Sequence, residues 1–431
     1  MTHTSRAPRR APASPRHRLA PALIALLLVG WLAGCKLGAP TSSDSKALSL
    51  LAIFPASGEQ SAIYVSMANA VDLAVKQNTS LGGGYTLSAT HLDETDAALG
   101  ASVAQALANP QVMGAIGPAT SPGAEAALPA LAQAGVVTIS PTAMLPGLTQ
   151  ASQASANGVT FSQLHPKGKP ISFFRQTADD SQAGVAAADL ALASTSAHGF
   201  GAHAVFVVDD GTPSGKAQAA AFERELKAAK GTLTGSASFT LGDAVGVQTA
   251  VSAIVDANPD CVFFAGDAAA AARLRATLSQ SGALAEPLLL AGSAAGDPGW
   301  GAAVGGALLG ANTTGLLPGQ NVTSMPGGKT FAAAYAAAFS GAQPTPQSAL
   351  AYDAAIDEIS ALKALIAAGK TPTRAGALQA VATGTYSGVT GKIAFDATGD
   401  LASAPLFAVY ATNAKGVWSY QTSVTGKLAA A

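Results

Sequence analysis

The sequence predicts an α/β fold in which strands and helices alternate, arranged in two units. Apolar runs of strand length recur between segments of helical periodicity, and strands joined by helices form the right-handed βαβ units of a parallel sheet. The chain has 431 residues, which exceeds one ordinary hydrophobic core. Abundant alanine and glycine, with only 6% aromatic residues, favour tight packing of helices on sheets.

The first unit begins after a short polar segment. An apolar run at residues 48–54 predicts a buried strand, and residues 62–77 have helical periodicity,. A second strand is predicted at 85–91 and a second helix at 96–108,. This alternation predicts a parallel sheet covered by helices.

The middle of the first unit, residues 116–143, contains two short apolar runs that each end in a hydroxyl-rich turn. Successive parallel strands of this kind open onto a ligand crevice at their carboxyl ends. Ser121 stands at the expected N-cap of the intervening helix, with Pro122 at the first helical position,. The helix N–H groups would then suit an anion such as a carboxylate. A simple capping role explains Ser121 equally well.

The second unit follows residue 170. Strands are predicted at 171–174, 204–208, 261–264 and 287–291, each before a helical or loop segment. Residues 150–170 are polar and without periodicity, and they are too long for an ordinary connection,. We expect this segment to be a surface insertion that could lie at the rim of a cleft.

The N-terminus has the features of an export signal. Arginines precede an apolar run at residues 19–31, and Leu32-Ala33-Gly34-Cys35 follows directly,. The run is too short to span a membrane. Its last four residues resemble a bacterial lipobox, which implies a signal peptide at 1–34, cleavage before Cys35, a lipid on the Cys35 sulfur and a flexible tether at 35–46.

Composition and motifs argue against several function classes. The formal net charge of −1 gives no electrostatic support for a nucleic-acid partner,. The histidines are dispersed without metal-ligand spacing, and the sequence contains no nucleophile elbow, P-loop or dinucleotide fingerprint,. We therefore expect no enzyme, no metal and no cofactor.

Motifs spread over the mature chain carry a resemblance to a known family. In chain order they are Ser57-Gly58, Gly82-Gly83-Gly84, Ile116-Gly117-Pro118, Ile139-Ser140-Pro141, Phe174-Arg175, Asp180, Ala351-Tyr352-Asp353-Ala354, Gly388-Val389-Thr390-Gly391, Phe395-Asp396 and Gly399-Asp400. Their order resembles type I periplasmic binding proteins of branched-chain amino acid ABC transporters, the Leu/Ile/Val-binding proteins. The resemblance implies two doubly wound, Rossmann-like lobes joined by three crossovers, with a ligand enclosed between them.

By this resemblance both lobes are discontinuous in sequence. The N-terminal lobe comprises residues 47–178 plus 316–403, and the C-terminal lobe comprises 179–315 plus 404–431. The crossovers fall near 177–180, 313–318 and 402–406. Closure of the lobes would give the form that a membrane permease recognises.

The resemblance also implies ligand contacts in the first lobe. Ser121 falls on the serine that holds the ligand carboxylate, and Ala143 on a residue whose backbone contributes. Thr142 lies beside Ala143, where its hydroxyl can add a contact. Ile63 and Tyr64 fall where an apolar or aromatic wall is expected.

On the other side of the cleft, the expected pattern is incomplete. Asp180 falls on an acidic residue beside the hinge, although it is about equally well explained as an N-cap for the helix from Ser181. The acid that would receive a ligand ammonium is replaced near Ser293, and an unpaired, desolvated ammonium costs several kcal/mol. Asp267 could supply the missing partner. The ligand is thus expected to carry a carboxylate without having to be a standard amino acid.

Together these features predict an exported lipoprotein, anchored to the cell envelope and facing the periplasm or the exterior. It would capture a small carboxylate-bearing ligand, a branched-chain amino acid or related compound, for an ABC transporter permease. An alternative is a lipoprotein scaffold that regulates a cell-wall synthase through the same fold without transporting a solute.

Overall fold

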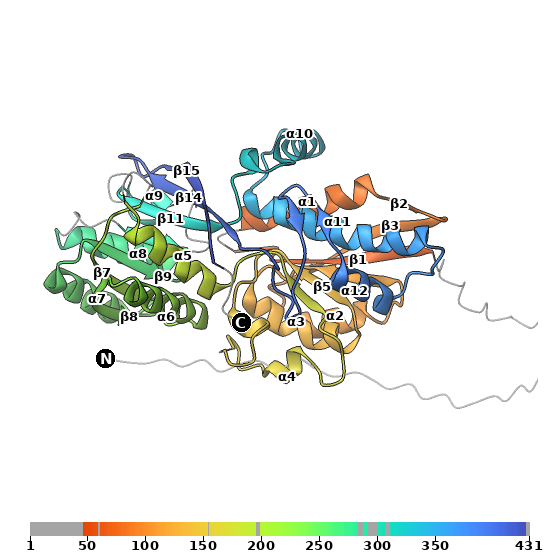
Figure 1. The fold of residues 1–431 in the computed structure, drawn as a ribbon, viewed down its shortest axis with the longest axis horizontal. Helices are drawn as coiled ribbons and strands as arrows, with labels where there is room; N and C mark the ends of the chain where they lie inside the picture. The colour runs from red at the N-terminus through yellow and green to blue at the C-terminus, as the bar shows by residue number, and fades with distance from the viewer. Residues whose placement is uncertain are drawn as a thin grey trace, which may run out of the picture. The chain divides into compact units, whose positions relative to one another are not determined.

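Two sheets organise the part of the chain that the computed structural model describes, residues 46–58, 61–153, 155–194, 199–282, 288–291, 300–306 and 311–427 (Figure 1). The first sheet has six strands in the order β2-β3-β1-β4-β5-β6. All of its neighbouring pairs are parallel except β2 with β3. Its strands are β1 (Ala47–Phe54), β2 (Ser80–Gly82), β3 (Tyr85–Asp93), β4 (Val112–Ile116), β5 (Val137–Ser140) and β6 (Phe173–Arg175).

Helices pack on both faces of this sheet, and we call the sheet with these helices the first lobe. One face is covered by α1 (Ser61–Gln77), α11 (Pro346–Ala367) and α12 (Arg374–Thr383), and α10 (Gly328–Ala338) packs against α1 on the outside of this layer. The other is covered by α2 (Leu99–Ala106), α3 (Ser121–Gln133) and the short α4 (Phe161–Leu164). A small hairpin, β12 (Tyr386–Ser387) with β13 (Lys392–Ile393), follows α12.

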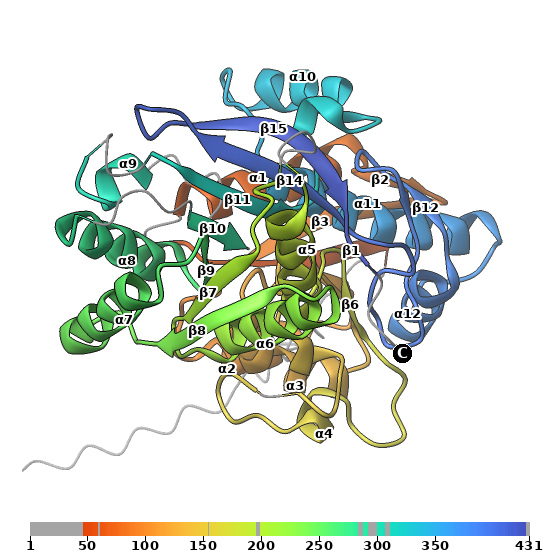
Figure 2. The same ribbon diagram turned by 60° about the vertical axis from the view of Figure 1, so that its left-hand side comes forward.

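The second sheet has seven strands in the order β15-β14-β11-β10-β9-β7-β8, and with its helices it forms the second lobe (Figure 2). Its strands are β7 (Ala204–Asp209), β8 (Thr232–Ser238), β9 (Cys261–Ala265), β10 (Leu288–Ala291), β11 (Thr313–Pro318), β14 (Leu406–Thr412) and β15 (Trp418–Thr425). The strands from β8 to β11 pair in parallel, whereas β14 and β15 are antiparallel. Helices α5 (Asp180–Leu192) and α6 (Pro213–Ala228) cover one face, and α7 (Ala244–Ala257), α8 (Ala268–Gln280) and α9 (Trp300–Ala303) cover the other.

The predicted fold class, two mostly parallel sheets each covered by helices, is confirmed. The described chain passes from one sheet to the other between β6 and α5, after β11, and before β14. The residue boundaries of the lobes derived from the sequence stay predictions.

Most predicted elements agree with the structure within a few residues. The strand predicted at 171–174 was wrongly placed at the start of the second unit: it is β6, which pairs in parallel with β5 and completes the first sheet. The helix predicted at 96–108 is shorter and covers Leu99–Ala106. It starts late because the Asp96 carboxylate accepts a hydrogen bond from the Ala98 N–H and holds a turn there,. Within the polar segment 150–170, the sequence analysis missed the four-residue helix α4.

Some predictions fall outside the described residues. These are the signal peptide 1–34, most of the tether 35–46 with the lipidation site Cys35, Pro287 at the start of the fourth strand of the second unit, and the candidate ligand contact Ser293. Among the helices of the described segments, none combines the length and apolar character needed to cross a bilayer.

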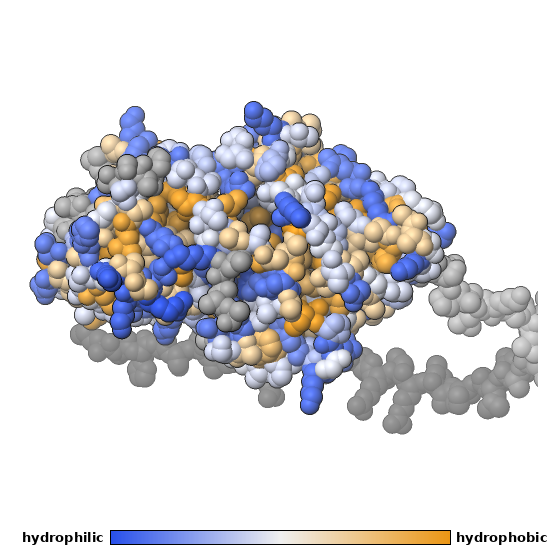
Figure 3. Space-filling model, in the orientation of Figure 1, coloured by the Kyte–Doolittle hydropathy of each residue, from blue (hydrophilic) through white to orange (hydrophobic). Residues whose placement is uncertain are grey.

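Large hydrophobic side chains are also exposed on the described surface. On the face drawn in Figure 3, hydrophilic and hydrophobic residues are interspersed. Over the whole described surface, the most exposed large hydrophobic side chain is Val245 on α7. Single residues of this kind are normal on a globular surface and need no partner.

Candidate functional site

A cavity of about 410 Å³ is lined by residues from both lobes. On the first-lobe side they come from α1 and from the segments that follow β4 and β5, and on the second-lobe side from α5 and the segments that follow β7 and β9. Ligands of open α/β sheets bind outside the carboxyl ends of the strands, and the volume is typical of a small-molecule site. The cavity is therefore the candidate ligand site.

The helix that follows β4 starts one residue earlier than the sequence predicts. The N-cap of α3 is Thr120, whose hydroxyl oxygen accepts a hydrogen bond from the Gly123 N–H at 3.1 Å. Ser121 is instead the first residue of the helix. Its hydroxyl oxygen accepts a hydrogen bond from the Leu145 N–H at 3.0 Å, which ties α3 to the loop after β5. The prediction that Ser121 is the N-cap was wrong.

A carboxylate of the protein itself occupies the N-terminus of α3. Glu94, which follows β3, accepts hydrogen bonds from the Ala119 N–H at 2.7 Å and the Thr120 N–H at 2.8 Å, and a further one from the Thr120 hydroxyl. The contact is so close that a Cβ on Gly123 would lie 2.1 Å from Glu94 Oε1. Burial raises the pKa of Glu94 to about 7, although these hydrogen bonds oppose the rise,.

The adjacent acids Asp93 and Glu94 have different roles. The Asp93 carboxylate holds the turn after β3, because it accepts hydrogen bonds from the N–H groups of Ala56 and Thr95. The position of Glu94 depends on the meeting of β3 with α3, which lie more than twenty residues apart. No local pattern around Glu94 indicates this contact.

The turn after β5 forms the neighbouring wall of the cavity. Thr142 and Met144 line it, and the Thr142 hydroxyl donates to the Ala119 carbonyl oxygen at 2.7 Å. Ala143 is buried behind the wall, where its N–H donates to Ser140 Oγ at 3.0 Å. The N–H of Ala143 is thus engaged inside the protein, and a ligand role for its backbone stays a prediction.

On α1, the side chains of Ile63, Tyr64 and Met67 line the cavity as an apolar and aromatic wall. Burial, followed by the nearby Glu94 carboxylate, raises the pKa of Tyr64 to about 12,. The Tyr64 phenol is therefore neutral at physiological pH.

The most buried acid in the cavity wall is Asp180, with an exposed fraction of 2%. Its Oδ1 accepts a hydrogen bond from Gln218 Nε2 at 2.7 Å. Burial raises the pKa of Asp180 to about 6, although hydrogen bonds from the side chains of Gln218 and Ser214 oppose the rise,. Asp180 does not cap the helix, because the N-cap of α5 is Asp179, which forms a capping box with Gln182,.

Two further aspartates line the cavity from the second lobe. Asp210 follows β7, where its Oδ1 accepts from the Thr212 N–H at 3.0 Å and its Oδ2 from the Asp267 N–H at 3.0 Å. Asp267 follows β9 and caps α8 by accepting from the Ala270 N–H at 2.7 Å, with its side chain exposed. Asp267 was predicted from the sequence as a candidate ligand contact, whereas Asp210 was not.

Three side chains in the wall have a buried polar atom without a hydrogen-bond partner among the described residues. They are Thr177 Oγ1, Asp180 Oδ2 and Gln218 Oε1. We call Thr177, Asp180 and Gln218 the polar corner. Buried polar atoms are rarely left unsatisfied in proteins, so these atoms point to a group that enters the cavity.

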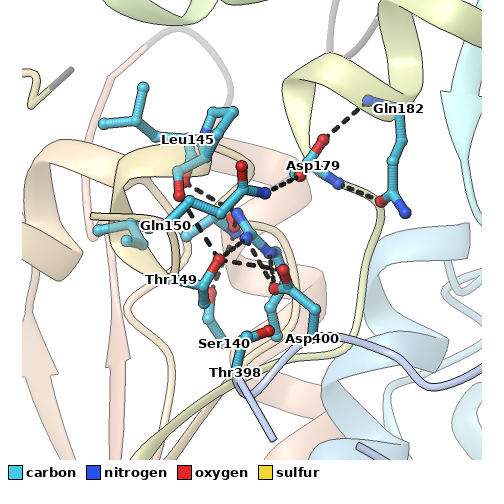
Figure 4. Close-up of polar contacts among 12 residues, drawn as sticks. Ser140, Leu145, Thr149, Gln150, Asp179, Gln182, Thr398 and Asp400 are labelled. Carbon is cyan, nitrogen blue, oxygen red and sulfur yellow. Dashed lines mark hydrogen bonds and ion pairs between the residues drawn. The ribbon is translucent and has the colours of Figure 1, made fainter. Parts of the chain in front are cut away.

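A buried arginine holds the junction between β6 and α5 next to the cavity. The Arg175 guanidinium pairs with Asp400 at 2.7 Å and donates to the Leu145 carbonyl oxygen at 2.9 Å. Figure 4 shows Thr149, Gln150, Asp179 and Asp400 gathered here, with Gln150 Nε2 donating to Asp179 Oδ2 at 2.9 Å. The Arg175 charge is thus balanced within this network.

A family model for periplasmic binding proteins matches residues 49–416 of the chain. The chain belongs to the periplasmic binding protein family. The type I fold that the sequence motifs imply is confirmed, and this family is one of extracytoplasmic solute-binding proteins. A search of the curated proteins finds no match.

Solved structures of periplasmic binding proteins share the fold at low sequence identity. A leucine-binding protein from Thermotoga maritima is 20% identical with a TM-score of 0.70, over 88% of this chain and 98% of that one. A branched-chain amino acid transporter substrate-binding protein from Streptococcus pneumoniae, in complex with isoleucine, is 20% identical with a TM-score of 0.68, over 88% and 99%. An ABC transporter solute-binding protein from R. palustris, in complex with benzoate, is 19% identical with a TM-score of 0.67, over 89% and 98%.

The cavity brings together most of the residues predicted from the sequence. Its lining includes Ile63, Tyr64, Ser121, Thr142, Asp180 and Asp267. The structure adds Thr177, Asp210 and Gln218 to the lining and Glu94 behind it. Within the described segments, no group of three or more His, Cys, Asp or Glu side chains is placed to hold a metal ion.

Proposed function

We propose that this periplasmic binding protein is the substrate-binding component of an ABC transporter and that it captures a small solute in the cavity between its lobes. The cavity carries the proposal, because residues from both lobes line it at the carboxyl ends of parallel strands,. Structures of the same fold include proteins described as leucine-binding or solved with isoleucine or benzoate. Binding without catalysis agrees with this family.

The proposed ligand carries a carboxylate, as the sequence motifs imply, and includes branched-chain amino acids and related compounds. Ser121 Oγ accepts its hydrogen bond from Leu145, so its own hydroxyl proton is available for a ligand oxygen,. Thr142 donates its hydroxyl proton to Ala119 and keeps lone pairs as an acceptor,. Asp180 and Asp267 are the proposed partners for an ammonium group.

We further propose that residues 1–34 are removed and that Cys35 carries the lipid that anchors the protein to the membrane. The solute would then be delivered to a permease in the same envelope. Mass spectrometry of the mature N-terminus tests this part directly. A chain that starts before Cys35, or a Cys35 without acyl chains, would contradict it.

Solute capture is tested by thermal unfolding of the full chain, purified in detergent, with a panel of amino acids, aromatic acids and amines. A ligand that binds the native state raises the melting temperature with concentration. Gln347→Trp, which places a bulky side chain in the cavity wall, should abolish the shift. Val245→Trp, at an exposed position on α7, should retain it.

The scaffold alternative predicts a different outcome. No compound of the panel would then raise the melting temperature, while a cell-wall synthase would be retained by the immobilised protein. These two results together would favour the scaffold function over solute capture.

A further inference from the structure

The charged side chains that line the cavity all have the same sign. Asp180, Asp210 and Asp267 are acidic, and no lysine, arginine or histidine of the described residues lines the cavity. The buried Arg175, two residues before Thr177, is already paired with Asp400. A ligand therefore enters an environment with an excess of negative charge.

Helix N-termini could in principle offset this charge, because their free N–H groups and dipoles attract anions. Four helices begin at the cavity, α3, α5, α6 and α8, and an acidic side chain of the protein already lies at each of them. Glu94 binds N–H groups at α3, and Asp180 is the first residue of α5. Asp210 binds the N–H of the residue that caps α6, and Asp267 caps α8. An anionic ligand would compete with these internal carboxylates.

The polar corner contains acceptor atoms that have no hydrogen-bond partner among the described residues. Gln218 uses its amide nitrogen to donate to Asp180 Oδ1, which leaves the Gln218 carbonyl oxygen and Asp180 Oδ2 as buried acceptors without partners among the described residues. The exposed fractions of Thr177, Asp180 and Gln218 are 5%, 2% and 4%. Ammonium and amidinium groups carry several donors and a positive charge, so they satisfy such a corner.

The rest of the cavity wall is suited to an apolar portion of the ligand. Met67, Met144 and Leu317 line it from the first lobe and the end of β11. Flexible methionine side chains adapt to aliphatic groups of different shape.

We propose that the ligand has a net positive charge and an aliphatic or other apolar body, and that its protonated amine or amidinium binds in the polar corner formed by Thr177, Asp180 and Gln218. This inference rests on the proposed function of solute capture and narrows the class of solute. A carboxylate-bearing ligand would need a second positive group, so branched-chain amino acids, which have no net charge at neutral pH, should bind more weakly than cations. Such a preference distinguishes the protein from a receptor for simple carboxylates.

A series of six-carbon compounds tests the charge requirement by calorimetric titration of the full chain in detergent. The series is hexanoate, norleucine, hexylamine and lysine, which at pH 7.5 carry one negative charge, no net charge, and one positive charge for each of the last two. We expect the better of the two cations to bind at least about tenfold more tightly than norleucine, and hexanoate not to bind. Tighter binding of hexanoate or norleucine than of both cations overturns the inference and leaves solute capture intact. Absence of binding both in this series and in the broader panel overturns both proposals.

Substitutions test whether the positive group of the ligand binds at Asp180. Asp180→Asn keeps an acceptor for Gln218 and should weaken binding of the cation by about 30-fold or more, as expected when a buried charged partner is lost,. Asp243→Asn makes the same change at the exposed N-cap of α7, outside the cavity wall, and should leave affinity unchanged. Equal affinities of these two variants would overturn the assignment to the polar corner.

A second substitution covers the case in which Asp180→Asn does not fold. Thr177→Val removes one acceptor of the corner with little change in shape and should weaken the cation several-fold relative to the control Asp243→Asn,. Affinity equal to that of the control would contradict a role of Thr177 toward the positive group.

Discussion

The substitution Glu358→Gln should stabilise the protein, and more so as the pH rises. Glu358 lies on α11 with 1% exposure and packs against β4 so closely that a Cβ on Gly114 would lie 1.6 Å from its Oε2. Burial is the main cause that raises the pKa of Glu358 well above its usual range; the backbone N–H of Ala115 opposes the rise and the neighbouring Asp357 adds to it,. The folded protein therefore retains the proton of this carboxyl group to a higher pH than the unfolded chain does.

The size of the effect follows from proton linkage. The unfolded chain ionises Glu358 above about pH 4.3, whereas the folded protein does not, so stability is complete below that pH and is lost as the pH rises toward the folded-state pKa. Each pH unit in this window costs about 1.4 kcal/mol. Glutamine is neutral in both states, so the variant should gain on the wild type at up to this rate as the pH rises through the window.

Urea unfolding of both proteins between pH 4.5 and 8 measures this difference, because other titrating groups such as Asp357 and Tyr386 are common to both. Glu125→Gln is the matched control. Glu125 is equally buried, but its carboxylate accepts from the N–H groups of Ala156 at 2.8 Å and Asn157 at 2.7 Å. The control should lose about 1.5 to 3 kcal/mol at pH 7. If Glu358→Gln is destabilised as much as the control, or its advantage does not grow with pH, the reasoning is refuted.

Three further predictions concern the junction, the first sheet and the cavity. Asp400→Ala leaves the Arg175 charge buried without its partner and should lower the free energy of unfolding by about 3 kcal/mol, measured by urea unfolding,; an unchanged midpoint would show that the pair contributes nothing. Gly114→Ala should cost about 1 to 3 kcal/mol because of the clash with Glu358, and Glu358→Ala in the same chain should restore part of it,. The pKa of Asp180 is about 6, so this carboxylate becomes protonated and loses its charge below pH 6. Affinity for a cationic ligand, measured by calorimetric titration, should therefore fall by up to about tenfold per pH unit below pH 6. Asp180→Asn should lack most of this pH dependence, and an equal pH dependence of affinity in the variant and the wild type would exclude Asp180 as its cause.

The alternation of apolar and helical segments was sufficient to predict the fold class, because hydrophobic periodicity reports directly which face of an element is buried. Capping residues were predicted less well. Thr120 and Asp179, rather than Ser121 and Asp180, cap their helices. In both cases adjacent residues can each act as a cap, and only the path of the backbone into the helix decides between them.

By itself, the sequence determined the α/β pattern, the family motifs and the position of a hydroxyl-rich turn at the end of two strands. Only the tertiary structure decided the charge of the site. Glu94 reaches the start of α3, and Asp180, Asp210 and Asp267 meet around one cavity although they follow different elements of the chain. Electrostatic interactions and buried hydrogen bonds depend on distances between segments remote in sequence, and those distances are set only when the two sheets and their helices pack.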